Sequence, residues 1–111
     1  MPTMLVACQS IGEAQDLLRY CLGGGGTVKP GKHFREELKA EGLDLPNAWQ
    51  VLRAGIIFNP PEVDVKTREW KHTVEGCEPD GKWLGIVFSF KAVDSVYLIT
   101  VFSVEAKRRA L

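Results

Sequence analysis

The sequence is poor in cysteine and has no excess of charge of either sign. Its three cysteines, Cys8, Cys21 and Cys77, are widely spaced and form no C-x-x-C pair. We therefore expect reduced thiols, with neither a disulfide framework nor a zinc site. Lysine and arginine together number 14, as do aspartate and glutamate. This balance argues against tight, non-specific binding of nucleic acid, which normally requires a basic excess.

Long apolar runs are also missing. No stretch approaches the ~18 apolar residues of a membrane span. The opening MPTMLVACQS has neither the cationic start nor the long apolar centre of a secretory signal. We therefore expect a cytoplasmic protein with no membrane partner. What is present, 45% apolar and 25% charged residues in a chain of 111, suits a single domain spanning residues 1–111.

The first half of the chain predicts helices. Residues 3–8 resemble a short strand, and the capping box SIGE then opens a helix over 11–22 that Gly23 ends. Four glycines follow, and TVK after them suggests a short edge strand. A second helix begins near Lys32 and ends at Gly42. A third has Asp44 as its cap, Pro46 in its first turn and Gly55 at its end.

From residue 56 the apolar period falls to two, which predicts strands. GIIFNPPEVDV is a short strand interrupted by two prolines, and REWKHTVEG alternates. PDG then marks a hairpin turn before the apolar run KWLGIVFSFK, which suits a central strand. VYLITVFSV is the last strand. Helices followed by strands indicate an α+β fold, with the helices on one face of an antiparallel meander of three to four strands.

Alternation along these strands predicts which side chains face away from the helices, on a surface that we call the open face. Trp70, His72 and Val74 suit the core. The residues expected on the open face are Lys71, Thr73, Glu75, Val87, Ser89, Leu98, Thr100 and Phe102. Arg68 shares the parity of Trp70 but lies at the strand's end, where it can turn to solvent. With the opposite parity, His72 would join the open face as a proton carrier.

A second histidine, His33, lies in the first turn of the second helix. The helix dipole disfavours a cation there, so we expect a neutral imidazole that can act as a base. The segment GTVKPGKH around it nearly matches a phosphate-binding loop. His33 stands where that loop needs Ser or Thr, and Pro30 removes a backbone donor. We therefore expect no nucleotide cofactor and no other cofactor or metal.

The segment from about Thr27 to Val104 resembles a prokaryotic family, the domain of unknown function numbered four-two-five-eight. The resemblance lies in GKHFREELKAEGLDLPNAWQVLRAG, EWKHTVEG, DGKWLGIVFSF and YLITVF. The family is placed near the RelE and BrnT toxins, in the barnase–EndoU–colicin–RelE ribonuclease superfamily. The resemblance implies a RelE-like core at 27–104, an added N-terminal strand and helix at 1–26, and a tail at 105–111. It also aligns the family's helix-opening histidine with His33 and its strand hydroxyl with Thr100.

Two functions follow from this reading. The first is a metal-independent ribonuclease, the toxin of a toxin–antitoxin pair, with RNA and a cognate antitoxin as partners. His33 would be the base, Lys71 and Arg68 the phosphate clamp, Glu75 or His72 the second proton carrier, and Thr100 the positioning group. The second is a non-catalytic interaction domain of the same fold that binds a partner chain or a second copy. Thr73, where many relatives carry arginine, and the neutral net charge favour the second.

Overall fold

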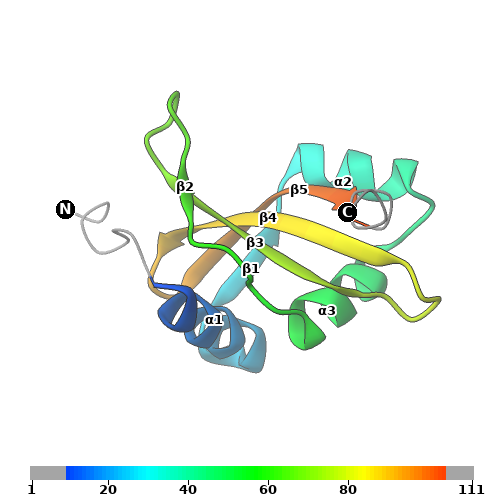
Figure 1. Ribbon diagram of the computed structural model, residues 1–111, viewed down its shortest axis with the longest axis horizontal. Helices are drawn as coiled ribbons and strands as arrows, with labels where there is room; N and C mark the ends of the chain where they lie inside the picture. Colours follow the sequence, from blue (N-terminus) through cyan, green and yellow to red (C-terminus); the bar gives the residue numbers. More distant parts are fainter. Residues whose placement is uncertain (1–9, 105–111) are drawn as a thin grey trace.

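The computed structural model describes residues 10–104 and has an α+β fold (Figure 1). The helices are α1 (Ile11–Tyr20), α2 (Lys32–Ala40) and α3 (Leu45–Ala54), and the strands are β1 (Thr27–Pro30), β2 (Glu62–Val63), β3 (Trp70–Cys77), β4 (Trp83–Ala92) and β5 (Ser95–Ser103). The predicted strand at 3–8 and the tail at 105–111 lie outside the described residues. Within residues 10–104, no helix is both long enough and apolar enough to cross a membrane.

The predicted helix boundaries hold closely, and α1 and α3 each begin at a side-chain cap. The Ser10 hydroxyl accepts from the Glu13 N–H at 3.1 Å, and the Glu13 carboxylate accepts from the Ser10 N–H at 2.9 Å. Asp44 and Asn47 form the same reciprocal box at the start of α3. The end of α1 differs from prediction: a wide helical turn, Cys21–Gly25, continues past Gly23. The chain reverses at Gly24 instead, where φ is 100° and a side chain would be strained.

The sheet is mixed and has five strands, in the order β1-β5-β4-β3-β2. The prediction of an antiparallel meander of three to four strands is therefore wrong in two respects. β1 pairs in parallel with the first half of β5, from Thr27 opposite Ser95 to Pro30 opposite Leu98. β2 adds two residues beside β3. Both are edge strands: β1 is the short edge strand predicted at TVK, and β2 is the two-residue remainder of the strand predicted in GIIFNPPEVDV. The predicted central position of β4 is confirmed.

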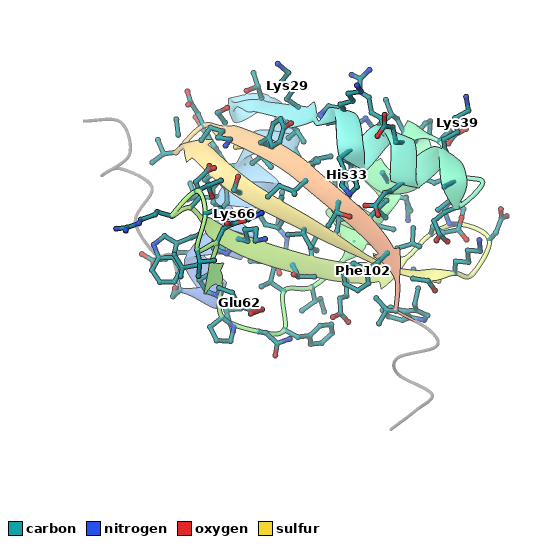
Figure 2. The ribbon with its side chains drawn as sticks, turned by 90° about the horizontal axis from the view of Figure 1, so that it is seen from above. Lys29, His33, Lys39, Glu62, Lys66 and Phe102 are labelled. Atoms are coloured by element: carbon teal, nitrogen blue, oxygen red, sulfur yellow. The ribbon has the colours of Figure 1, made fainter. Side chains whose placement is uncertain are left out.

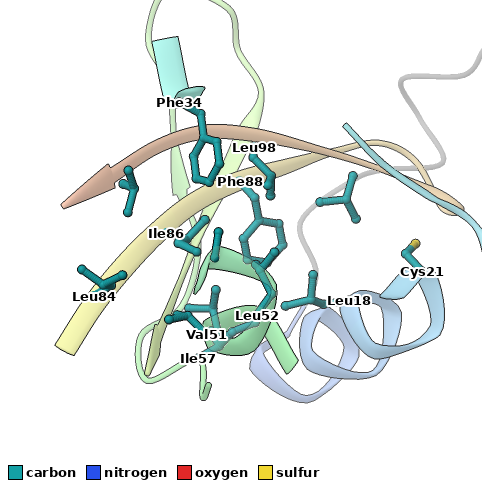
Figure 3. Packing of buried hydrophobic residues seen from close by; sticks show 14 of the residues in the cluster. Leu18, Cys21, Phe34, Val51, Leu52, Ile57, Leu84, Ile86, Phe88 and Leu98 are labelled. Atoms are coloured by element: carbon teal, nitrogen blue, oxygen red, sulfur yellow. The ribbon is translucent and has the colours of Figure 1, made fainter. Parts of the chain in front are cut away.

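The helices do not all cover one face of the sheet. Figure 1 shows α1 and α3 beneath the sheet, whereas α2 lies beside β5, past the end of β1. From this edge, Phe34 and Leu38 of α2 still reach the core and are 0% and 3% exposed. Figure 3 shows Phe34 near Leu98 and Phe88, on the side of the sheet where α1 and α3 supply Leu18 and Leu52. The opposite side of β3, β4 and β5 carries no helix, as Figure 2 shows.

Candidate functional site

The open face consists of three strands in register. Thr73 of β3 lies opposite Val87 of β4, which lies opposite Thr100 of β5. The next row along the strands runs from Glu75 through Gly85 to Phe102, and Ile56 pairs with Glu75 at the edge. The predicted orientation of β3 is confirmed, because His72 and Val74 are buried while Lys71, Thr73 and Glu75 are half-buried on the other side.

Phe102 and Gly85 form an aromatic platform in that second row. A β-carbon on Gly85 would lie 2.4 Å from the end of the Phe102 ring, so the ring extends over the backbone of Gly85. The ring is only partly exposed. Flat aromatic rings on a sheet surface are the usual stacking partners of unpaired nucleobases.

Two residues predicted for the open face are buried. Leu98 is fully buried, because a register shift in the β4–β5 ladder turns it toward the core: Phe88 pairs with Leu98, but Val87 pairs with Thr100. Ile99, which the shift leaves unpaired in the ladder with β4, is only partly buried. Ser89 has the predicted parity and lies opposite Tyr97, yet it is 1% exposed, and its hydroxyl has no partner among the described residues.

His33 is joined to Thr100 through Glu37. The Nε2 of His33 lies 3.3 Å from Glu37 Oε1, one helical turn along α2, and the Thr100 hydroxyl contacts the same carboxylate oxygen. This contact turns Nε2 toward the carboxylate, which leaves Nδ1 as the ring nitrogen available to another group. The His33 side chain is 67% exposed, so it is open to a substrate (Figure 2). A base oriented by a carboxylate is a recurrent catalytic arrangement.

A second charged group lies at the other edge of the open face. Lys71 Nζ is 3.1 Å from Asp64 Oδ2, and Arg68 is an exposed residue of the same β2–β3 loop. One strand separates Thr73 from Thr100, which places their backbones about 10 Å apart at ordinary strand spacing. The structure therefore brings His33 and Thr100 together but places Lys71, Arg68 and Glu75 across the sheet from them.

His72 is not part of the open face. It is 2% exposed and stacks on Phe88, with ring centroids 5.3 Å apart and planes inclined by 22°. Its Nδ1 has no hydrogen-bond partner among the described residues. Burial lowers the pKa of His72 from 6.5 to about 4. Its candidate role as a surface proton carrier is therefore wrong, and the predicted orientation of His72 toward the core is confirmed.

Comparisons with protein-family models, curated proteins and solved structures gave no match to this chain. The site must accordingly be judged by its own geometry. Among residues 10–104, no group of three or more histidine, cysteine, aspartate or glutamate side chains is arranged to hold a metal ion.

Two acidic residues that organise the site were missed at the sequence level. Glu37 follows His33 by four positions, a spacing that places both side chains on one face of a helix, so the signal was present. Helical spacing could not reveal Asp64, because it lies in a loop without a periodic pattern and its partner Lys71 lies in β3. Glu78, outside the site, is another acidic residue that the sequence did not single out. It is buried and accepts a hydrogen bond from the Lys82 N–H, so it stabilises the β3–β4 turn.

Proposed function

We propose that the open face is the site of a metal-independent ribonuclease, with His33 as the base. The observation that carries the proposal is the contact chain from His33 through Glu37 to Thr100, at the junction of α2 and the uncovered side of β5. The family resemblance of residues 27–104 supports a RelE-like core and the role of a toxin paired with an antitoxin. A base alone supplies roughly 10²- to 10⁴-fold in rate, so binding must supply the rest.

The proposed reaction is attack of the ribose 2′-oxygen on the adjacent phosphorus. His33 Nδ1 takes the 2′-hydroxyl proton as the new O–P bond forms. The bond from phosphorus to the 5′-oxygen breaks, and that oxygen takes a proton from water. The products are a 2′,3′-cyclic phosphate and a 5′-hydroxyl. Glu37 then faces an imidazolium, and its charge offsets the unfavourable helix dipole at this position.

Two features of the open face would hold the substrate. The start of α2 has no side-chain cap, since its cap residue is Gly31. Its first amide groups therefore offer partial positive charge for a phosphate beside His33. Phe102, two residues along β5 from Thr100, offers a ring on which a base can stack. Lys71 and Glu75 lie too far across the sheet to act on the same phosphate, so they would contact a neighbouring nucleotide.

The test is cleavage of single-stranded RNA in the presence of EDTA, followed by identification of the chemical groups at the ends of the products. Wild-type protein should release cyclic phosphate ends, and His33→Ala should lower the rate by about 100-fold or more. Glu37→Gln should give a smaller loss. Glu36→Gln is the matched control, because Glu36 is an exposed carboxylate on the same helix. Intact RNA after long incubation with folded wild-type protein would refute the proposal.

A second candidate function, a non-catalytic interaction domain, is favoured by the apolar edge beside β3. Ile56 and Phe58 are 50% and 48% exposed there, and Lys71 and Lys91 form ion pairs with Asp64 and Glu69. Such a surface suits a protein partner, since burying it removes apolar area from water. A dimeric mass in solution that Ile56→Ser converts to a monomeric one, together with absent RNA cleavage, would establish this function in place of the first.

A further inference from the structure

We propose that the β2–β3 loop, Asp64–Glu69, is a preformed contact element for the phosphate backbone of single-stranded RNA. The inference rests on the proposed function and assigns the loop a binding role separate from the chemistry at His33. Figures 1 and 2 show the loop rising on the uncovered side of the sheet, with Lys66 at the margin of the open face. The Lys71–Asp64 ion pair ties the loop to the open face itself.

The loop is held in shape by Asp64. One carboxylate oxygen accepts from the N–H groups of Lys66 at 2.8 Å and Thr67 at 3.2 Å, while the other pairs with Lys71. Backbone bonds from Arg68 N–H to the Asp64 carbonyl, and from Asp64 N–H to the Glu69 carbonyl, close the turn. Because the loop is already ordered, it loses little conformational entropy when a ligand binds.

Arg68 lies at the position of this turn where the backbone has a left-handed conformation. Its φ is 62°, and it is the one non-glycine residue with positive φ among residues 10–104. Glycine or asparagine normally stands at such a position, because a larger side chain is strained there. Strained residues of this kind concentrate at functional sites. Arg68 therefore places its guanidinium at the loop at some cost in backbone strain.

The charges at the loop tip are available to an anion. Within residues 10–104, the side chains of Lys66 and Arg68 make no ion pair or hydrogen bond, and both are exposed. The loop's own acids, Asp64 and Glu69, are already paired with Lys71 and Lys91. A flexible lysine and a forked arginine on one turn suit successive phosphates of a single strand. RNA is favoured over a lipid surface because the tip offers only one apolar side chain, Val65, for insertion.

The test is binding of a short 2′-O-methyl oligoribonucleotide, which lacks the attacking hydroxyl, measured by fluorescence anisotropy at several salt concentrations. Arg68→Gly should weaken binding roughly fivefold. It should also reduce the slope of log affinity against log salt concentration by the contribution of about one phosphate contact. It should also raise Tm by about 4 °C, since it removes the strain. Arg68→Lys should restore most of the binding. Arg53→Ala, an equal loss of charge from α3, should change neither the affinity nor its salt dependence.

Binding and cleavage measured on the same variants separate the role of the loop from the proposed ribonuclease activity. If Arg68→Gly and Lys66→Ala bind the oligonucleotide as tightly as wild type while His33-dependent cleavage persists, the loop has no role and the ribonuclease proposal stands. If binding depends on Arg68 but RNA is never cleaved, the loop assignment stands alone. Binding of wild-type protein to anionic phospholipid vesicles, with no binding to the oligonucleotide, would overturn the inference in favour of a membrane contact.

Discussion

At the scale of single residues, His72 is a buried base among aromatic rings. Phe88 stacks on it and Phe90 meets it edge-on, so a charge on the imidazole would have no polar surroundings. The pKa of His72 is about 4 in the folded protein, against 6.5 for an unperturbed histidine. The unfolded chain therefore binds a proton over a range of pH in which the folded chain does not.

The sign of the resulting pH dependence follows directly. Stability is full above pH 6.5 and falls as the pH drops toward 4, by about 3 kcal/mol in total. Asp64 and Glu13 have pKa values lowered from 3.8 and 4.5, caused mainly by backbone hydrogen bonds, so their contributions to stability begin to be lost as the pH falls toward those values. Urea unfolding at a series of pH values measures the effect. His72→Leu should remove the decline between about pH 6.5 and 5, where the carboxyl groups do not yet contribute, and an unchanged decline there would contradict the assignment.

Sequence reasoning at this scale succeeded where strand alternation was regular and failed where it was broken. In β3, parity correctly separated His72 from Lys71, Thr73 and Glu75. In β5, the register shift near Ile99 reversed the expected side of Leu98. A bulge adds one residue to one strand, and the segment Tyr97–Phe102, with Thr100 as its one clearly polar residue, carries no pattern that signals it.

At the scale of elements, the end of α3 touches β3 through two glycines. A β-carbon on Gly55 would lie 2.5 Å from the Val51 carbonyl oxygen and 2.8 Å from that of Glu75. One on Gly76 would lie 2.9 Å from the Gly55 Cα. These are backbone atoms that cannot swing aside, so both positions require glycine for α3 to lie against the sheet.

Gly55→Ala should therefore destabilise the fold by about 2 to 4 kcal/mol, as overpacking against backbone does. Gly12→Ala is the matched control: nothing lies within 4 Å of its β-carbon position in α1. The control should be neutral or stabilising by up to about 1 kcal/mol, from helix propensity. Thermal or urea unfolding measures both. Equal stability of the two variants would show that the α3–β3 contact is looser than described.

Element identity was more predictable than element pairing. The Asp44 cap and the glycine stops located α3 and the end of α2 to within about two residues, because these signals are local. The parallel pairing of β1 with β5 joins residues almost 70 positions apart, and a four-residue strand ending in Pro30 has no pattern that specifies a partner. For the same reason, the His33–Glu37 pair could be predicted on α2, but its contact with Thr100 could not.

At the scale of the whole molecule, net charge is balanced and the functional hypothesis depends on one face. The covered side of the sheet holds the core, whereas the open side holds His33, Thr100 and Phe102, with the Asp64–Glu69 loop at its margin (Figure 2). With no basic excess and few cations beside the open face, we expect RNA binding that is weak and only modestly dependent on salt. We therefore expect RNA to contact the protein on the open face.

Amide chemical-shift mapping by NMR, during titration with the 2′-O-methyl oligonucleotide, tests this location most directly. The account predicts that the shifted amides cluster at Thr73, Val87, Thr100 and Phe102, at the start of α2 and in the Asp64–Glu69 loop. Amides of α1 and of the exposed side of α3 should stay in place. Shifts concentrated on α1 and α3, or none at saturating oligonucleotide, would contradict it.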